Sequence, residues 1–140
     1  MEADAKVFAA LMRHLKVFDQ DHHTVIMMQV ENEVEIMGDS MDRSVDANEL
    51  FDQPMPENLW QHPRQNFDCL HPTFQAKFAD VKGSTATGLS WTQAFAEGPS
   101  TDDLFMANAF SLFIQHVAAA GPAEYEIPIY VNVAPCNEDE

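Results

Sequence analysis

The chain has 140 residues, 46% of them hydrophobic, which is enough apolar material for one ordinary folded domain. Its 23 acidic and 7 basic residues give a formal net charge of -16, so its field repels phosphate backbones and anionic lipid. Nucleic acid and membrane surfaces are therefore excluded as expected partners. Two cysteines, Cys69 and Cys136, fit neither a disulfide framework nor a metal knuckle, and we expect no metal and no cofactor.

The N-terminal residues contain neither a basic segment nor an apolar run, so the sequence shows no signal peptide. No stretch approaches the roughly 18 apolar residues of a membrane span. If the chain begins at its natural start, we expect it in the cytoplasm.

The first predicted element is an amphipathic helix near residues 3–18. Apolar residues recur there at helical spacing, with basic and histidine residues among the positions between them. The apolar positions are Val7, Phe8, Leu11, Leu15 and Phe18. A polar turn at residues 19–23 ends the helix and leads directly into the next element.

A strand near residues 24–31 follows, and it has two different halves. Thr24 to Met28 are mostly apolar and partly β-branched, which is typical of a strand buried on both faces. The chain then changes to the polar residues Gln29, Glu31, Asn32 and Glu33, interrupted by Val30. Because α/β folds place their chemistry at the carboxyl ends of parallel strands, this polar end predicts an active site.

Residues 34–100 contain no strong strand signal and many turn signals. Ser44 is expected to cap a short helix through Leu50, and Pro56 begins another helix. Ser90 is expected to cap a third, in which Trp91 and Phe95 share one face. A connection of this length predicts an elaborated active-site loop.

The clearest helix is expected near residues 102–120, capped by Thr101 and ended by Gly121 and Pro122. A second buried strand is expected near residues 127–133. The order helix, strand, long excursion, helix, strand indicates an α/β fold with one right-handed βαβ unit.

Glu33 is the strongest candidate for catalysis. Glycoside cleavage needs a carboxylic acid to protonate the leaving oxygen and a second carboxylate to attack or to activate water. Asn32 beside it can donate a hydrogen bond to a sugar hydroxyl. The competing interpretation is that these are ordinary polar residues where a strand meets a loop.

The run from Ile26 to Val34 resembles a strand of the β-galactosidases of glycoside hydrolase families 35 and 42. The matching residues are Ile26-Met27-Met28-Gln29-Val30-Glu31-Asn32-Glu33-Val34. The segments after it, through the expected second strand, also look like that family. The resemblance implies that residues 1–140 are a partial (β/α)8 TIM barrel, from about the third helix to the fifth strand, with parallel strands and a long βα excursion.

The resemblance also implies functional roles. Glu33 takes the role of acid/base and Asn32 contacts the sugar, in a retaining hydrolase acting on a β-galactoside-like carbohydrate. Glu31, Gln29 and Asn132 are further candidates for substrate contact, although a structural hydrogen bond or ion pair is the favoured role of each. The sequence departs from the family at Glu35, where the family usually has glycine.

The resemblance places the catalytic nucleophile beyond this chain. A complete barrel needs about 250 residues, and the family's nucleophile ends the seventh strand, so it is expected outside these residues. Within the chain, Asp39, Asp42 and Glu31 are the weaker alternatives for a second carboxylate.

An alternative is that the chain is a catalytically inactive fragment, or a module that binds sugar or a partner. Strands cut from a barrel leave open edges, through which the chain can self-associate. Trp60, Trp91 and Phe67 could stack on a sugar ring, although core packing is the favoured use of these aromatic residues. His22 and His23 precede the strand at its amino end, where a structural role is favoured over metal binding.

Overall fold

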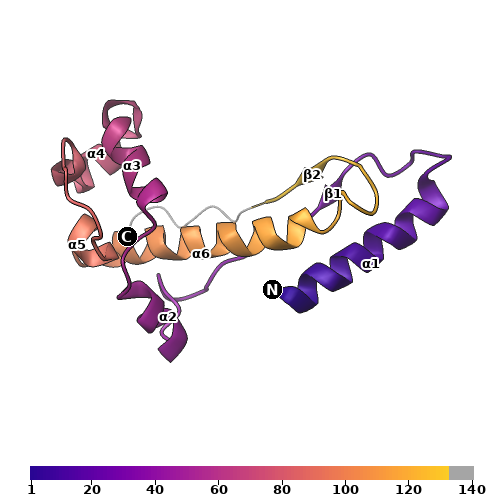
Figure 1. Cartoon of the computed structure of the whole chain (residues 1–140), viewed down its shortest axis with the longest axis horizontal. Coiled ribbons are helices and arrows are strands. Elements are labelled where there is room, and N and C mark those ends of the chain that lie inside the picture. The colour runs from indigo at the N-terminus through magenta and orange to yellow at the C-terminus, as the bar shows by residue number, and fades with distance from the viewer. Residues whose placement is uncertain (133–140) are drawn as a thin grey trace. The chain divides into compact units, whose positions relative to one another are not determined.

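The computed structural model describes residues 1–132, and these are mostly helical (Figure 1). Two short strands form the sheet. Two 3-10 turns, η1 and η2, join helices in the middle of the chain. In chain order the elements are α1 (Glu2–Asp19), β1 (Met28–Gln29), α2 (Val45–Phe51), α3 (Glu57–Gln65), η1 (Phe67–Cys69), α4 (Pro72–Lys77), η2 (Ala79–Val81), α5 (Trp91–Phe95), α6 (Pro99–Ala119) and β2 (Ile129–Tyr130).

The expected partial TIM barrel is wrong. Within residues 1–132 the sheet consists of β1 and β2 alone, each two residues long and paired in parallel. The expected buried strand of residues 24–31 is reduced to Met28–Gln29, and Ile26 and Met27 are 69% and 48% exposed. A parallel strand becomes buried on both faces only when neighbouring strands and covering helices surround it, and the described residues supply one neighbouring strand.

The chain divides into two compact units. Unit 1 contains Met1–Glu35 together with the chain from Ala107 onward, and unit 2 contains Ile36–Met106. The region expected to be an elaborated active-site loop is therefore a helical unit in its own right. Within the described residues, no helix is long and apolar enough to cross a membrane.

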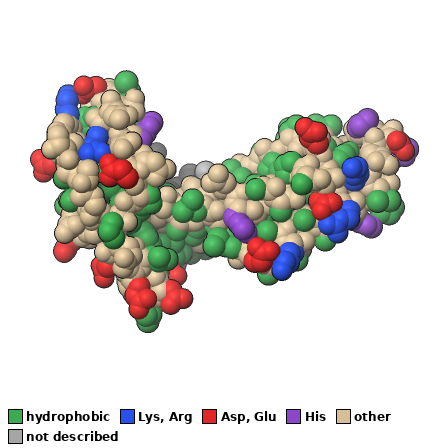
Figure 2. Space-filling model, viewed as in Figure 1, with side chains coloured by type: hydrophobic (Ala, Val, Ile, Leu, Met, Phe, Trp, Pro, Cys, Tyr) green, Lys and Arg blue, Asp and Glu red, His purple; other side chains and the backbone are tan. Residues whose placement is uncertain are grey.

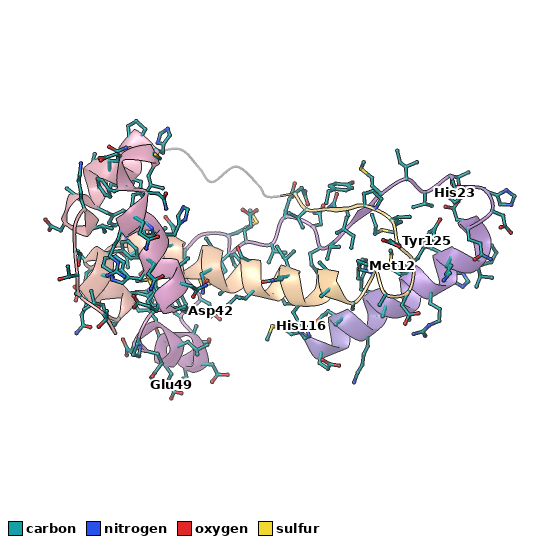
Figure 3. The ribbon with its side chains drawn as sticks, turned by 45° about the horizontal axis from the view of Figure 1, so that its top comes forward. Met12, His23, Asp42, Glu49, His116 and Tyr125 are labelled. Atoms are coloured by element: carbon teal, nitrogen blue, oxygen red, sulfur yellow. The ribbon has the colours of Figure 1, made fainter. Side chains whose placement is uncertain are left out.

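Unit 1 has a small apolar core between α1, β1 and α6. Its buried members are Phe8, Met12, Val30, Val117 and Tyr125. Figure 3 shows Met12 and Tyr125 close together on this core. The amphipathic helix thus buries the stripe that carries Phe8 and Met12.

A neighbouring stripe of α1 departs from the expected apolar face. Val7, Leu11 and Phe18 are exposed, although all three were expected to face the core. Figure 2 shows apolar side chains on the surface of this unit among acidic, basic and histidine side chains. The small core of unit 1 thus uses the stripe that carries Phe8 and Met12, and Phe18 packs against the ring of His14 on the same helix.

The parallel pairing of β1 with β2 sets the register of unit 1. Met28 pairs with Ile129 and Gln29 with Tyr130. The amide of Met28 donates to the carbonyl of Pro128 at 2.9 Å, and the amide of Val30 donates to the carbonyl of Tyr130 at 3.0 Å. The expected second strand of residues 127–133 is Ile129–Tyr130, and Val133 lies outside the described residues.

A buried carboxylate fixes the turn between α1 and β1. Asp19, 4% exposed, accepts hydrogen bonds from the amides of Thr24 and Val25, from the Thr24 hydroxyl, and from the Tyr125 hydroxyl at 3.0 Å. The hydrogen bond from the Thr24 hydroxyl is the main cause that lowers the pKa of Asp19 to about 2, and the backbone amides of Val25 and Thr24 add to it. Asp19 therefore ties the helix end, the strand entrance and the chain after α6 together.

Unit 2 is organised by helix caps and aromatic packing. The Ser44 hydroxyl accepts from the amide of Ala47 at the start of α2, and Ser90 and Gln93 form a reciprocal capping box at α5, as the sequence predicted. The aromatic rings of Trp60, Phe67, Phe74, Phe78, Trp91, Phe95 and Phe105 contact one another edge to face or tilted. This cluster is the core of unit 2.

The predicted cap at Thr101 is wrong. The helix α6 begins at Pro99, and Thr101 lies inside its first turn. The Thr101 hydroxyl, 1% exposed, donates instead to the carbonyls of Phe95 and Ala96 at 3.2 and 2.7 Å. Thr101 thus joins α5 to α6.

Candidate functional site

Polar side chains gather where β1 and β2 end. Gln29 is the last residue of β1, Asn32 lies three residues beyond it, and Asn132 lies two residues beyond the end of β2. Because the strands are parallel, both carboxyl ends meet at one edge. We refer to Gln29, Asn32 and Asn132 as the amide cluster.

The amide cluster is held by hydrogen bonds among its own side chains. The Gln29 Nε2 atom donates to Asn32 Oδ1 and to Asn132 Oδ1, both at 2.8 Å, and to the carbonyl of Glu31 at 3.0 Å. The Asn132 Nδ2 atom donates to Asn32 Oδ1 at 3.4 Å. One amide nitrogen carries two hydrogens, so the three bonds of Gln29 share its donors and saturate them.

The two carboxylate residues of the motif have unusual backbones. Glu31 has φ 57° and Glu33 has φ 48°, both in the left-handed region that residues other than glycine rarely adopt. The amide of Glu33 donates to Asn132 Oδ1 at 3.3 Å. Such backbones persist where the surrounding structure holds them, and they are often found at functional sites. Glu35 is not among the residues with a left-handed backbone.

The motif presents its candidate residues to different environments. Glu33 and Asn32 are exposed, whereas Glu31 and Gln29 are half-buried. Glu33 is thus accessible to a ligand, and Asn32 shares that accessibility while its carbonyl oxygen is held by the cluster. The Nε2 hydrogens of Gln29 are donated to acceptors within the protein.

Asp39 and Asp42, the weaker candidates for a second carboxylate, are engaged in contacts within unit 2. Asp39 pairs with Arg43 at 2.9 Å, and the hydrogen bond from this guanidinium lowers the pKa of the Asp39 carboxyl. Asp42 accepts from the amide of Ser44 at 2.8 Å at the start of α2. Both carboxylates therefore stabilise local structure.

The aromatic residues of unit 2 serve the core. Trp60 and Trp91 are each 2% exposed and Phe67 is buried. The Trp60 Nε1 atom donates to the carbonyl of Ala86 at 2.9 Å. These side chains are unavailable for stacking on a sugar, so the structural alternative is correct for all three.

A hollow in unit 2 is another place that could bind a small ligand. An open hollow of about 430 Å³ is lined by Gln61, Arg64, Gln65, Gly83, Ser84 and Thr85. The Arg64 guanidinium there is occupied by Glu57 at 2.7 Å and by the carbonyl of Ala86 at 3.0 Å. Among the described residues, no group of three His, Cys, Asp or Glu side chains could hold a metal ion, and this includes His22 and His23.

The sequence interpretation gave two residues of unit 1 too small a role. Asn132 was noted only as a weak substrate contact, yet it connects β2 to Gln29 and Glu33. The available signal was that Asn132 follows a strand in the way Asn32 does. Asp19 was treated as part of a turn, although a carboxylate after a helix and before a strand can accept several amides.

Comparison with known proteins does not extend this description. No protein-family model matches the sequence, and no curated protein matches it. The motif and the geometry at the strand ends are therefore the features of the chain that bear on its function.

Proposed function

We propose that this chain carries the acid/base part of a retaining glycoside hydrolase site resembling that of the β-galactosidases. Glu33 is the proton donor and Asn32 contacts a sugar hydroxyl. One observation supports the proposal above the others: Asn32 and Glu33 are exposed side by side at the carboxyl ends of two parallel strands, on a backbone held by the amide cluster. The proposal needs this edge and does not need a barrel.

The chemistry assigns two successive tasks to Glu33. Its carboxylic acid protonates the glycosidic oxygen as the bond to the sugar breaks, and its carboxylate then removes a proton from the water that releases the sugar. A retaining mechanism also needs a nucleophilic carboxylate about 5 to 5.5 Å from the acid. We expect that second carboxylate outside these 140 residues, so the chain alone does not turn over.

Asn32 is the proposed sugar-binding residue beside Glu33. With its Oδ1 atom accepting from Gln29 and Asn132, Asn32 directs its Nδ2 donor away from the cluster. A sugar hydroxyl oxygen can accept from that donor. Glu31 contributes its carbonyl to the cluster, and its half-buried carboxylate is at most a peripheral sugar contact.

Sugar binding by the isolated chain is the first test. Calorimetric titration with galactose, and with glucose as the matched epimer, should show weak binding that Asn32→Ala removes while circular dichroism stays unchanged. Asn108→Ala, a change of the same kind on α6, serves as the control. A Kd on the order of 100 mM corresponds to a binding free energy of only about 1.4 kcal/mol. Absence of any heat from either sugar at that concentration would therefore contradict the proposed site.

Kinetics provide the second test, in an active polypeptide that contains these residues. Glu33→Gln should abolish hydrolysis of glycosides with poor leaving groups and spare the first step on activated aryl glycosides, because activated leaving groups need no protonation. Equal loss on both substrate types would remove Glu33 from the acid/base role. Measurable turnover of an aryl galactoside by the 140-residue chain alone would contradict the expected position of the nucleophile.

A partner-binding module is the second candidate function, because α1 and the entrance to β1 expose apolar side chains. Val7, Phe18 and Ile26 are more than half exposed. Exposed apolar surface of this kind is typical of interaction sites. Light scattering should give the mass of a dimer or larger assembly if this function is correct, and a monomer that binds galactose would favour the glycosidase proposal.

A further inference from the structure

We propose that Asn132 and Gln29 are positioning residues for the acid/base site. The inference rests on the proposed function, because it concerns how Glu33 and Asn32 are held for a carbohydrate. It changes the role of Gln29, which the sequence suggested as a substrate contact. It also adds Asn132, which comes from the other strand.

Asn132 holds the backbone of Glu33. Its Oδ1 atom accepts from the Glu33 amide at 3.3 Å and from Gln29 Nε2 at 2.8 Å. Glu33 has a left-handed backbone, which a residue with a β-carbon leaves readily unless a contact retains it. The bond from Asn132 is a contact that fixes the direction in which Glu33 leaves the strand end.

Gln29 orients the side chain of Asn32. The Asn32 Oδ1 atom accepts from Gln29 Nε2 at 2.8 Å and from Asn132 Nδ2 at 3.4 Å. Two donors on one oxygen select one of the two amide orientations, because the flipped amide would place donor against donor. The Nδ2 group of Asn32 is therefore available to a hydroxyl oxygen of the ligand.

The Nε2 atom of Gln29 and the Oδ1 atom of Asn132 are used within the protein. Gln29 Nε2 serves three acceptors, and Asn132 Oδ1 accepts from Gln29 and from the Glu33 amide. A sugar contact through either of these two atoms would require one of the bonds to break. The cluster therefore acts through Glu33 and Asn32.

Four variants of the 140-residue chain test this inference. Asn132→Leu removes the three hydrogen bonds of the Asn132 side chain, whereas Asn132→Asp keeps an oxygen that can accept from the Glu33 amide. Gln29→Leu removes the donors to Asn32, and Gln115→Leu makes the same change at an exposed position of α6. Circular dichroism establishes that each variant is folded, and Gln29→Leu provides an independent test if Asn132→Leu does not fold.

Two readouts separate positioning from a purely structural tie between the strands. Asn132→Leu should speed hydrogen exchange at the Glu33 amide by about tenfold, and Asn132→Asp should retain most of the protection. Galactose affinity should fall about tenfold in Asn132→Leu and in Gln29→Leu, and should not change in Gln115→Leu. The inference is overturned if hydrogen exchange at the Glu33 amide is unchanged in Asn132→Leu. It is also overturned if galactose affinity is unchanged in both Asn132→Leu and Gln29→Leu.

The two proposals fail in different ways. If the original chain binds galactose and the folded leucine variants bind it equally well, positioning is overturned and the proposed function remains. If the original chain binds no sugar while hydrogen exchange at the Glu33 amide responds to Asn132→Leu, the proposed function fails. Asn132 then only connects the two strand ends, so its positioning role for a sugar site is overturned as well.

Discussion

The two units use their polar side chains in different ways. In unit 2 they cap helices and form ion pairs: Ser44 caps its own helix, Ser90 exchanges bonds with Gln93, and Arg43 pairs with both Asp39 and Asp102. In unit 1 the amide cluster joins the ends of two strands, since Gln29 contacts Asn132. The caps and ion pairs of unit 2 stabilise its helices, whereas the neutral amides of unit 1 converge where two strands end.

The largest expected effect is in the core of unit 2. Trp91→Ala should lower the free energy of unfolding by about 3–5 kcal/mol, because Trp91 is 2% exposed and contacts Phe95 and Phe105. Urea denaturation followed by circular dichroism measures the loss. Trp91→Phe, which keeps a ring, should cost less. A loss below about 1 kcal/mol for Trp91→Ala would contradict the core role and reopen sugar stacking.

The core of unit 1 provides the matching test. Met12 is 0% exposed, so Met12→Ala should lower the free energy of unfolding by about 2–5 kcal/mol. Val7 lies on a neighbouring stripe of α1 and is 69% exposed, so Val7→Ala should change the free energy of unfolding by no more than about 0.5 kcal/mol. Equal losses in the two variants would contradict the exposure of Val7 and would favour the second candidate function, in which a partner covers this stripe.

A close contact at the end of α6 predicts a smaller effect. A β-carbon at Gly121 would overlap the ring of Phe8. Gly121→Ala should therefore destabilise the chain by about 1–3 kcal/mol, and Phe8→Leu in the same chain should recover part of the loss by making room. Additive losses in the double variant, measured by urea denaturation, would mean that the two residues do not touch.

Acid stability depends on Asp19. Its folded pKa is lowered to about 2 from 3.8, so its contribution to stability is complete above about pH 5 and is lost as the pH falls through the folded pKa. Asp19→Asn should flatten the dependence of stability on pH in this window, because the group no longer titrates. The exposed neighbour Asp21→Asn should leave the profile close to the original. An acid transition that Asp19→Asn leaves unchanged would contradict this assignment.

Local features of the fold could be predicted from the sequence. The caps at Ser44 and Ser90 depend on neighbouring residues, and the structure has both. The predicted α/β barrel is wrong, because the length of β1 depends on neighbouring strands that its own residues do not specify. Propensity over residues 24–28 favoured a strand, but Ile26 remains exposed in the absence of a covering layer.

The candidate site was predicted only in part, because some of its contacts join residues that are far apart in the sequence. Gln29, Asn32 and Glu33 belong to one continuous motif, so the sequence alone brought them together. The hydrogen bonds that Asn132 accepts depend on the parallel register of β1 and β2, which no local pattern encodes. The left-handed backbones of Glu31 and Glu33 likewise contradict the usual preference of glutamate and have no local signal.

Residue-resolved titration of the chain with galactose tests the central claim most directly. Backbone and side-chain amide signals are followed by nuclear magnetic resonance at increasing sugar concentration. We expect the shifts to concentrate at the Asn32 side-chain amide and the Glu33 backbone amide in unit 1, with smaller changes at Gln29 and Asn132. Shifts confined to the indole signals of Trp60 and Trp91 in unit 2, or no shifts at all, would contradict the site at the strand ends.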